Sequence, residues 1–289
     1  MTRENYNVAF FGTSDFSVVV LEELEKTGFT PTKIITAPDA PQGRKLVLTA
    51  SLVKLWARTR NIPVLEPKDL NDHNFLAELK ETPWDLFIVA SYGKIIPEHI
   101  INLPRKKTLN VHPSLLPKFR GASPIQTTIL QDERETGVTI MELDEKMDHG
   151  PIVSQKEVEL RAWPLGALDL EKILAHEGGR LLAETIPLWV RGQITPQPQN
   201  HAEATFTNKI KKVDGLLKLD EDPYKNYLKI LAYQGWPHAY FFTERNGKEI
   251  RVNIMEASFK DDVLTIERVI PEGKREMSYE EFLLGSKKV

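Results

Sequence analysis

The chain has 289 residues, 41% of them hydrophobic and 27% charged, an ordinary composition for one large or two modest globular domains. Its 38 basic and 41 acidic residues give a net charge of −3, so a nucleic-acid partner would need a local basic patch. The chain contains no cysteine, which excludes disulfides, thiolate metal sites and cysteine nucleophiles. No apolar run approaches the ~20 residues that span a bilayer and nothing resembles a signal peptide, so we expect a cytoplasmic protein without a membrane partner.

The first part of the chain alternates short apolar runs with helical patterns. Residues 8–11 predict a strand, 16–24 a helix and 33–36 the next strand, an order typical of a parallel, doubly wound sheet. The turn after the first strand holds one glycine, so the G-x-G-x-x-G dinucleotide fingerprint is absent, and no G-x-x-x-x-G-K-[ST] loop occurs. These absences argue against a nicotinamide dehydrogenase and a P-loop nucleotidase.

Further elements extend this predicted sheet. Residues 85–90 form a continuous apolar run of the kind buried on both faces, and it leads into a loop at 91–97. In open α/β sheets, ligands bind at the carboxyl ends of strands, so this loop could line a pocket. After a strand at 108–111, the segments 137–143 and 152–158 predict an antiparallel pair at the sheet edge. Two helices are expected next, at 168–177 and 180–190, separated by Gly178-Gly179.

The composition changes at residues 192–201, which are polar and include two prolines. We therefore predict an α/β domain over 1–190, a linker over 191–205 and a smaller β domain over 206–289. Short strands at 216–219, 240–242, 250–255 and 264–269, with a closing helix at 278–284, predict an all-β module. Its first residues include a basic cluster that could contact phosphate, made of Lys209, Lys211 and Lys212.

Three polar residues could meet beside the predicted sheet. Asn110 and His112 stand two residues apart on a strand, so their side chains point to the same face. The Asn amide can donate to a carbonyl oxygen that becomes negative, and the His ring can exchange a proton near neutral pH. Asp148, in the turn between the last two strands, could orient that ring. These groups suit attack by an external amine on an activated carbonyl, although isolated Asn, His and Asp residues are more often cap, turn and surface residues.

The stretch that holds these residues resembles the signature of a known family. Residues 110–124, followed by 136–140 and 148–150, are similar to the ordered motif of the folate-dependent formyltransferases. The wider similarity covers nearly the whole chain and indicates the branch of the family that acts on methionyl-tRNA. It is carried by residues 11–16, 38–44, 90–97 and 271–277.

The resemblance implies a Rossmann-like formyltransferase fold with a smaller OB-like C-terminal domain. It implies transfer of the formyl group of 10-formyltetrahydrofolate to the α-amine of initiator methionyl-tRNA. By position, Asn110, His112 and Asp148 match the family's catalytic trio, and Arg44 and Lys45 lie in a loop similar to one that enters the acceptor end of the tRNA. The segments that match the family's folate contacts comprise Ser114, Leu115, Leu116, Pro117, Tyr92, Gly93, Ile95, Ile96 and Pro97. We expect a monomer, and no metal site, because no H-E-x-x-H or comparable spacing occurs.

Two departures from the family keep other functions open. The predicted β module has four strands where an OB-fold has five, and the loop around Arg44 carries fewer lysines and prolines than the family usually shows. One alternative is an N-formyltransferase that uses the same folate but acts on an amino-sugar nucleotide. A hydrolase, in which water attacks the formyl-folate, and a catalytically idle RNA-binding protein are the others.

Overall fold

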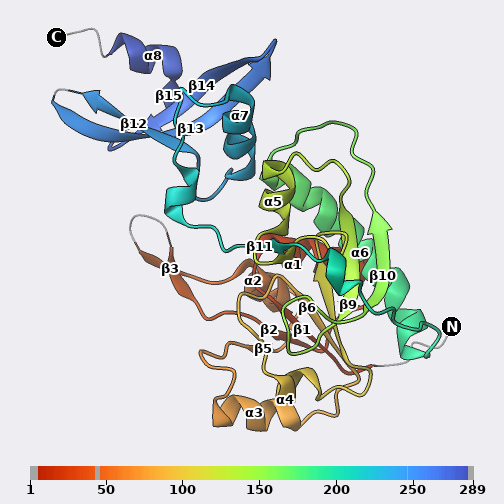
Figure 1. Cartoon of the computed structure of the whole chain (residues 1–289). Helices are drawn as coiled ribbons and strands as arrows, with labels where there is room; N and C mark the ends of the chain where they lie inside the picture. Colours follow the sequence, from red (N-terminus) through yellow and green to blue (C-terminus); the bar gives the residue numbers. More distant parts are fainter. Residues whose placement is uncertain (1–5, 43–45, 246, 286–289) are drawn as a thin grey trace. The chain divides into compact units, whose positions relative to one another are not determined.

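The structure is a computed structural model that describes residues 6–42, 46–245 and 247–285 (Figure 1). These residues form two compact units. The first comprises Met1–Arg120, Gly137–Val158 and Lys172–Thr205, and the second comprises Gly121–Thr136, Glu159–Glu171 and Phe206–Val289. Both units are therefore discontinuous in sequence, whereas the predicted domains are continuous. The limits at 190 and 206 remain a proposal.

The first unit is built on a seven-stranded sheet with the strand order β10-β9-β7-β6-β1-β2-β5. Neighbouring strands pair in parallel from β7 through β6, β1 and β2 to β5. Strand β9 runs antiparallel to both β7 and β10. This confirms the predicted doubly wound, mostly parallel sheet with an antiparallel pair at one edge. The strands are β1 (Val8–Gly12), β2 (Lys33–Ile35), β5 (Val64–Leu65), β6 (Leu86–Ala90), β7 (Thr108–His112), β9 (Gly137–Glu142) and β10 (Ile152–Glu157).

Burial explains why the central strands form. Every residue of β1, β6 and β7 is buried, as expected for parallel strands covered on both faces. The helices of this unit are α1 (Asp15–Lys26), α2 (Leu52–Arg58), α3 (His73–Lys80), α4 (Glu98–Ile101) and most of α6 (Ala167–Val190). Two of them begin at the expected type of cap, since Ser51 and Asp72 accept hydrogen bonds from the backbone N–H groups of Lys54 and Phe75.

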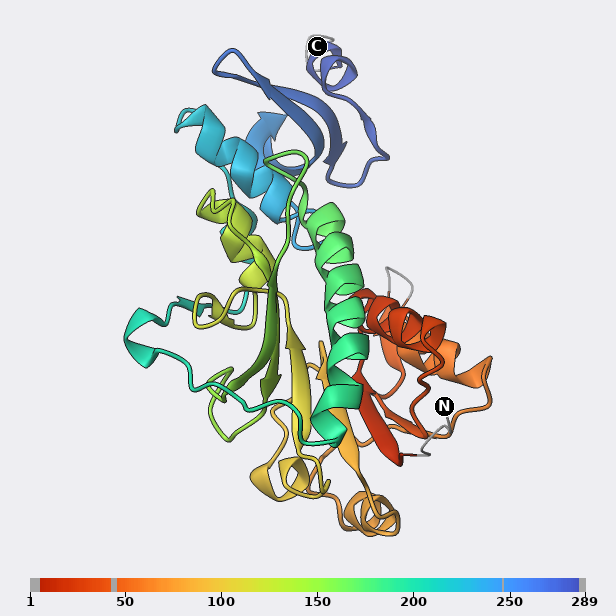
Figure 2. The ribbon, with the colours of Figure 1, turned by 90° about the vertical axis from the view of Figure 1, so that its right-hand side faces the viewer.

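Helix α6 corrects one prediction, because it continues through Gly178-Gly179 instead of breaking there. A Cβ atom on Gly178 would lie 2.7 Å from Val111 Cγ1 of β7, and one on Gly179 would lie 2.6 Å from Glu23 Cβ of α1. The two glycines therefore let the helix approach the sheet and α1 closely, as Figure 2 shows for the long green helix beside the strands. Close packing outweighs the ~1 kcal/mol that each glycine costs in a helix.

The loop predicted around residues 37–45 contains a strand, β3 (Ala40–Gln42), which pairs with β4 (Val47–Thr49) as a hairpin. The predicted tRNA-contacting residues Arg44 and Lys45 lie outside the described residues. Lys54 holds the base of the hairpin, with its Nζ 2.6 Å from Asp39 Oδ1 and 2.8 Å from Glu66 Oε2.

The second unit contains a four-stranded antiparallel sheet in the order β12-β13-β14-β15. The predicted strands at 240–242, 250–255 and 264–269 lie within its first three strands. The fourth strand is β15, not residues 216–219, of which Leu216 alone forms an isolated bridge to Tyr240. A small β domain is therefore confirmed, with one strand misplaced. The strands are β12 (Tyr240–Arg245), β13 (Lys248–Lys260), β14 (Val263–Pro271) and β15 (Met277–Ser278).

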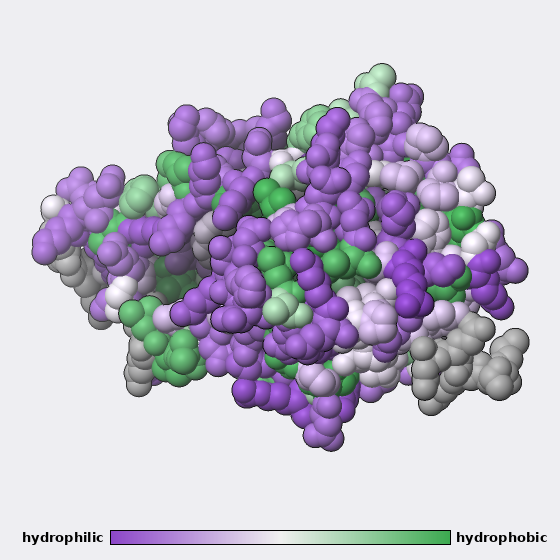
Figure 3. Space-filling view, turned by 90° about the horizontal axis from the view of Figure 1, so that it is seen from below, coloured by the Kyte–Doolittle hydropathy of each residue, from purple (hydrophilic) through white to green (hydrophobic). Residues whose placement is uncertain are grey.

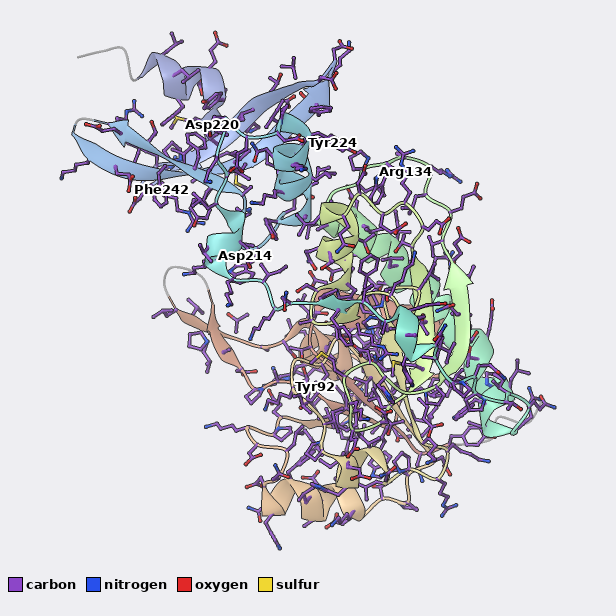
Figure 4. The ribbon with its side chains drawn as sticks, viewed as in Figure 1. Tyr92, Arg134, Asp214, Asp220, Tyr224 and Phe242 are labelled. Atoms are coloured by element: carbon purple, nitrogen blue, oxygen red, sulfur yellow. The ribbon has the colours of Figure 1, made fainter. Side chains whose placement is uncertain are left out.

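Helices pack against this sheet and tie the unit together. A side-chain core that includes Ile230, Phe241 and Phe282 joins α7 and α8 to the strands. Asp132 Oδ1 accepts hydrogen bonds from Trp163 Nε1 and from the hydroxyl of Tyr224, which is labelled in Figure 4. The helices are α5 (Pro124–Leu130), α7 (Pro223–Ala232) and α8 (Tyr279–Leu284), and the chain's remaining short elements are β8 (Arg120–Gly121), η1 (His201–Glu203), β11 (Phe206–Thr207) and η2 (Lys212–Gly215).

Within the described ranges, no helix combines the length and apolar character needed to cross a membrane. On the face seen in Figure 3, hydrophilic residues predominate and hydrophobic residues lie in small groups between them. Exposed hydrophobic residues of this kind are normal on protein surfaces.

Candidate active site

Strand β7 carries the first two residues of the candidate site. Asn110 and His112 are 9% and 4% exposed, and the alternation of a strand directs both side chains to one face of the sheet. The backbone of β7 is fixed on both sides, by β6 at Asn110 and by β9 at both residues. The side-chain amide of Asn110 offers two N–H groups that can donate to a ligand.

The ring of His112 has two different neighbours. Its Nε2 lies 3.0 Å from the backbone oxygen of Phe119, and its Nδ1 lies 3.7 Å from Asp148 Oδ1. A carbonyl oxygen can only accept, so Nε2 carries a proton and donates it to Phe119. The remaining nitrogen, Nδ1, is the one that can take up a proton, and it faces a carboxylate that would stabilise the resulting positive charge. The structure thus brings together two of the predicted residues, His112 and Asp148.

Asp148 reaches His112 from a loop. Strand β9 runs antiparallel to β7, and its last residue, Glu142, pairs with Leu109 near the start of β7. The loop after β9 therefore has to run back along β7 to bring Asp148 to His112 at the other end of that strand. Asp148 itself adopts a left-handed backbone conformation, with φ of 47°. Its backbone oxygen accepts a hydrogen bond of 3.0 Å from Gln199 Nε2, which also donates to the oxygen of Gly150 at 2.7 Å.

Gln199 connects this loop to a buried arginine. Arg120 is 3% exposed, and its Nε and Nη2 donate to Gln199 Oε1 at 3.1 and 2.6 Å. Burial lowers the pKa of Arg120, while the nearby carboxylates of Asp148 and Asp144 act in the opposite direction. No local pattern indicated this role for Gln199, because it lies in the polar, proline-containing stretch predicted as a linker.

A pair of stacked histidines borders the same loop. The rings of His149 and His201 lie 4.1 Å apart and are nearly parallel. His149 Nδ1 is 2.6 Å from Asp144 Oδ2, and Arg120 Nη2 lies 2.8 Å from His201 Nδ1. Desolvation, followed by the proximity of His149 and Arg120, lowers the pKa of His201. A neutral His201 is what this contact requires, because Nδ1 must accept the arginine N–H.

The loop predicted to line the folate site, at 91–97, contains residues that differ in their burial. The hydroxyl of Tyr92 (Figure 4) is buried and has no hydrogen-bond partner among the described residues, and burial raises the pKa of Tyr92 to about 12. A buried hydroxyl without a partner is unfavourable, which favours a ligand or water beside it. Gly93 and Ile95 are exposed, whereas Ile96 packs in the core and Pro97 precedes α4.

The second predicted folate segment, at 114–117, is held by internal hydrogen bonds. Ser114 is fully buried, and its Oγ donates to the oxygen of Lys118 at 2.7 Å. Thr139 Oγ1 donates to Ser114 O and accepts from the backbone N–H of Leu116. Leu116 is also buried, while Leu115 and Pro117 are partly exposed. Folate contacts by this segment remain a prediction.

The other predicted groups lie apart from His112 in the sequence. Lys209, Lys211 and Lys212 are exposed residues of the second unit, and their contact with tRNA remains a prediction. Within the described parts of the chain, no group of three or more histidine and acidic side chains is placed to hold a metal ion.

Comparison with known proteins gives consistent family matches. The Formyl transferase family model matches residues 6–186. A methionyl-tRNA formyltransferase from Thermodesulfovibrio yellowstonii is 35% identical over 297 aligned residues, covering 97% of this chain and 96% of that protein. Further relatives at 33 to 37% identity carry the same name.

Solved structures share the fold at lower identity. A methionyl-tRNA formyltransferase from Clostridium thermocellum has a TM-score of 0.62 and 18% identity, covering 92% of this chain and 99% of that one. An N-formyltransferase from Helicobacter canadensis, in complex with folinic acid and dTDP-3-aminofucose, has a TM-score of 0.64 and 18% identity, covering 95% and 99%. At this level of identity, the likeness concerns the fold alone.

Proposed function

The chain belongs to the formyl transferase family, and from this premise we propose that it transfers the formyl group of 10-formyltetrahydrofolate to the α-amine of initiator methionyl-tRNA. The observation that carries the proposal is the 35% identity to a methionyl-tRNA formyltransferase over nearly the full length of both proteins. The amino-sugar enzyme from Helicobacter canadensis shares the fold but is 18% identical, so it gives less support for a sugar acceptor.

The acceptor amine needs little activation. An α-amine has a pKa of about 7.7, and the neighbouring ester of an aminoacyl-tRNA lowers this pKa further, so much of the nucleophile is uncharged at pH 7. The main tasks of the site are therefore to hold the amine against the formyl carbon and to stabilise the negative oxygen that forms.

The residues on β7 and its neighbouring loop fit these tasks. When the amine nitrogen bonds to the formyl carbon, the carbonyl electron pair moves to oxygen, where the amide N–H of Asn110 can donate to it. His112 Nδ1 takes the proton that the attacking nitrogen must lose, and Asp148 at 3.7 Å stabilises the charged ring. The bond to the folate nitrogen then breaks, and that nitrogen leaves with the electron pair and receives the proton. The products are an N-formyl amide and tetrahydrofolate.

Two further statements belong to this proposal. We propose that the protein acts in the cytoplasm, where charged tRNA and folate occur together, and that it acts as a monomer. Asn110, His112 and Asp148 all lie in one compact unit, so the proposed site needs no residue from a second copy of the chain.

The test is to incubate the purified chain with 10-formyltetrahydrofolate and either initiator methionyl-tRNA or an amino-sugar nucleotide. We expect formylated methionyl-tRNA and no formylated sugar. Formylation of the sugar alone would replace the proposed acceptor, and release of formate without any acceptor would indicate a hydrolase. Binding of tRNA without transfer would identify an idle RNA-binding protein.

A further inference from the structure

We propose that residues 197–205, here called the strap, position both neighbours of the His112 ring and that Gln199 is the main positioning residue. The proposal rests on the proposed function, because the ring is assumed to exchange the proton of the amine. The strap was predicted as part of a linker, yet it lies in the first unit and contacts the candidate site at several points. It contacts no reacting atom of the proposed mechanism and acts through Asp148 and Phe119.

The first contact of the strap holds the loop of Asp148. Gln199 is 5% exposed, and its amide donates to the backbone oxygens of Asp148 and Gly150 at 3.0 and 2.7 Å. Its own oxygen accepts from buried Arg120. The Gln199 side chain therefore links the turn that carries the Asp148 carboxylate, through its amide nitrogen, to the buried Arg120 guanidinium, through its amide oxygen. Just before it, Gln197 and Ile152 exchange two backbone hydrogen bonds of 2.8 Å, which anchor the start of the strap to β10.

The second contact of the strap holds the other neighbour of the ring. Phe119 supplies the carbonyl that accepts from His112 Nε2, and its backbone N–H donates to Thr205 Oγ1 at 2.8 Å. The backbone of Thr205 also accepts from Arg120 N at 2.9 Å and donates to Pro117 O at 3.3 Å. The strap thus controls Asp148 on the Nδ1 side of the ring and Phe119 on the Nε2 side.

Backbone conformation supports a positioning role. Asp148 and Phe119 both have positive φ values, 47° and 60°, which are unfavourable for residues other than glycine. Such conformations persist where surrounding contacts determine them, and they cluster at functional sites. The contacts that could do so here are the amide of Gln199 for Asp148 and the hydroxyl of Thr205 for Phe119.

The decisive variant is Gln199→Glu. A glutamate keeps an oxygen acceptor for Arg120, so the buried cation stays paired, but it replaces the amide donor by a carboxylate oxygen facing two carbonyls. Gln199→Met keeps the size of the side chain and removes both functions. Gln197→Ala is the matched control, because Gln197 is exposed and its side chain donates to the backbone oxygen of Thr195, which lies just before the strap.

We expect Gln199→Glu to lower kcat about 10²-fold, the effect of a displacement of about 1 Å in a catalytic group, while the KM values for folate and tRNA stay close to those of the wild type. Gln199→Met should show the same loss, and Gln197→Ala should match the wild type. A purely structural role would lower the melting temperature of Gln199→Glu and leave kcat unchanged at temperatures where the protein is folded. That outcome, or full activity of Gln199→Glu, would overturn the proposal.

A second readout does not depend on turnover. The ring ¹⁵N signals of His112, recorded by NMR without substrates, should shift in Gln199→Glu and stay unchanged in Gln197→Ala. Thr205→Val, which removes the acceptor of Phe119 N–H, should also shift them and lower kcat about tenfold, whereas Thr205→Ser should restore both. Unchanged His112 signals in Gln199→Glu and Thr205→Val would refute the positioning role. Absence of formyl transfer by the wild type would instead refute the proposed function and leave this NMR test valid.

Discussion

The candidate site has two halves that are held in different ways. Asn110 and His112 lie on a buried strand whose backbone pairs with neighbours on both sides. Asp148 and Phe119 lie in loops with left-handed backbone conformations, and side chains from residues 197–205 hold them. In the strand half, the sheet determines the geometry, whereas in the loop half it depends on a few long-range hydrogen bonds.

This difference predicts how substitutions in each half should change activity and stability. A substitution in the strand half removes a chemical group from an intact frame, so its effect should fall on kcat with little change in folding. A substitution in the loop half can remove a group, release a strained backbone or both, so activity and stability should change together wherever the backbone conformation is affected. Four experiments test this contrast and the packing that supports it.

Asn110→Ala should have the largest effect on activity. Loss of one donor to a developing oxyanion typically lowers kcat by about 10²–10³-fold. Because the backbone of β7 stays paired, folate binding, measured by titration, and the melting temperature should change little. Near-normal turnover would show that Asn110 is not the donor, and loss of folate binding would show that the strand half also depends on this side chain for its structure.

Two substitutions of Asp148 distinguish the effect of its charge from the effect of its strained backbone. Asp148→Asn keeps a residue that tolerates the left-handed conformation and removes the negative charge beside His112, so we expect kcat to fall about 10²-fold with stability retained. Asp148→Ala should lose as much activity and in addition about 1–2 kcal/mol of stability, because alanine is strained at positive φ. Chemical denaturation measures the second effect. Equal stability of the two variants would mean that the loop relaxes freely.

The two glycines of α6 provide a pair matched in chemistry and helix. Either Gly→Ala change should destabilise the protein by about 1–3 kcal/mol through overpacking. Gly178→Ala presses on Val111, which lies between Asn110 and His112, whereas Gly179→Ala presses on Glu23 and α1. We therefore expect only Gly178→Ala to lower kcat when both are assayed well below their melting temperatures. Equal kcat values would show that the sheet absorbs the added methyl group.

Acid should destabilise the protein at Glu23, which joins α1 to α6 through its contact with His176. Burial raises the pKa of Glu23, but hydrogen bonds from Lys26 and His176, at 2.7 and 2.6 Å, outweigh it and leave the pKa below the usual 4.5. A lowered pKa contributes stability that is present above pH 4.5 and is lost as the pH falls through the pKa of the folded state. The free energy of unfolding of the wild type, measured with urea, should decrease in this range. The decrease should be smaller in Glu23→Gln. Identical pH profiles would show that other carboxylates dominate.

Local sequence patterns predicted the regular parts of the fold well. The apolar runs of β1, β6 and β7 and the antiparallel pair at the sheet edge follow from periodicity and burial. The predictions went wrong where packing overrides local preference. Gly178-Gly179 indicated a helix break, yet close contact with Val111 and Glu23 keeps the helix continuous. Residues 216–219 had a strand-like composition but pair with the sheet through one bridge only.

The sequence by itself determined the strand that carries Asn110 and His112, because the alternation of polar and apolar side chains is a local property of five residues. It also placed Asp148 in a turn after the next strand, and the order of the motif indicated formyl transfer. Only the tertiary structure decided that Nε2 of His112 is the protonated nitrogen and that Gln199 supports the loop of Asp148. Gln199 and Asp148 are 51 residues apart, and no local pattern encodes a hydrogen bond over that separation.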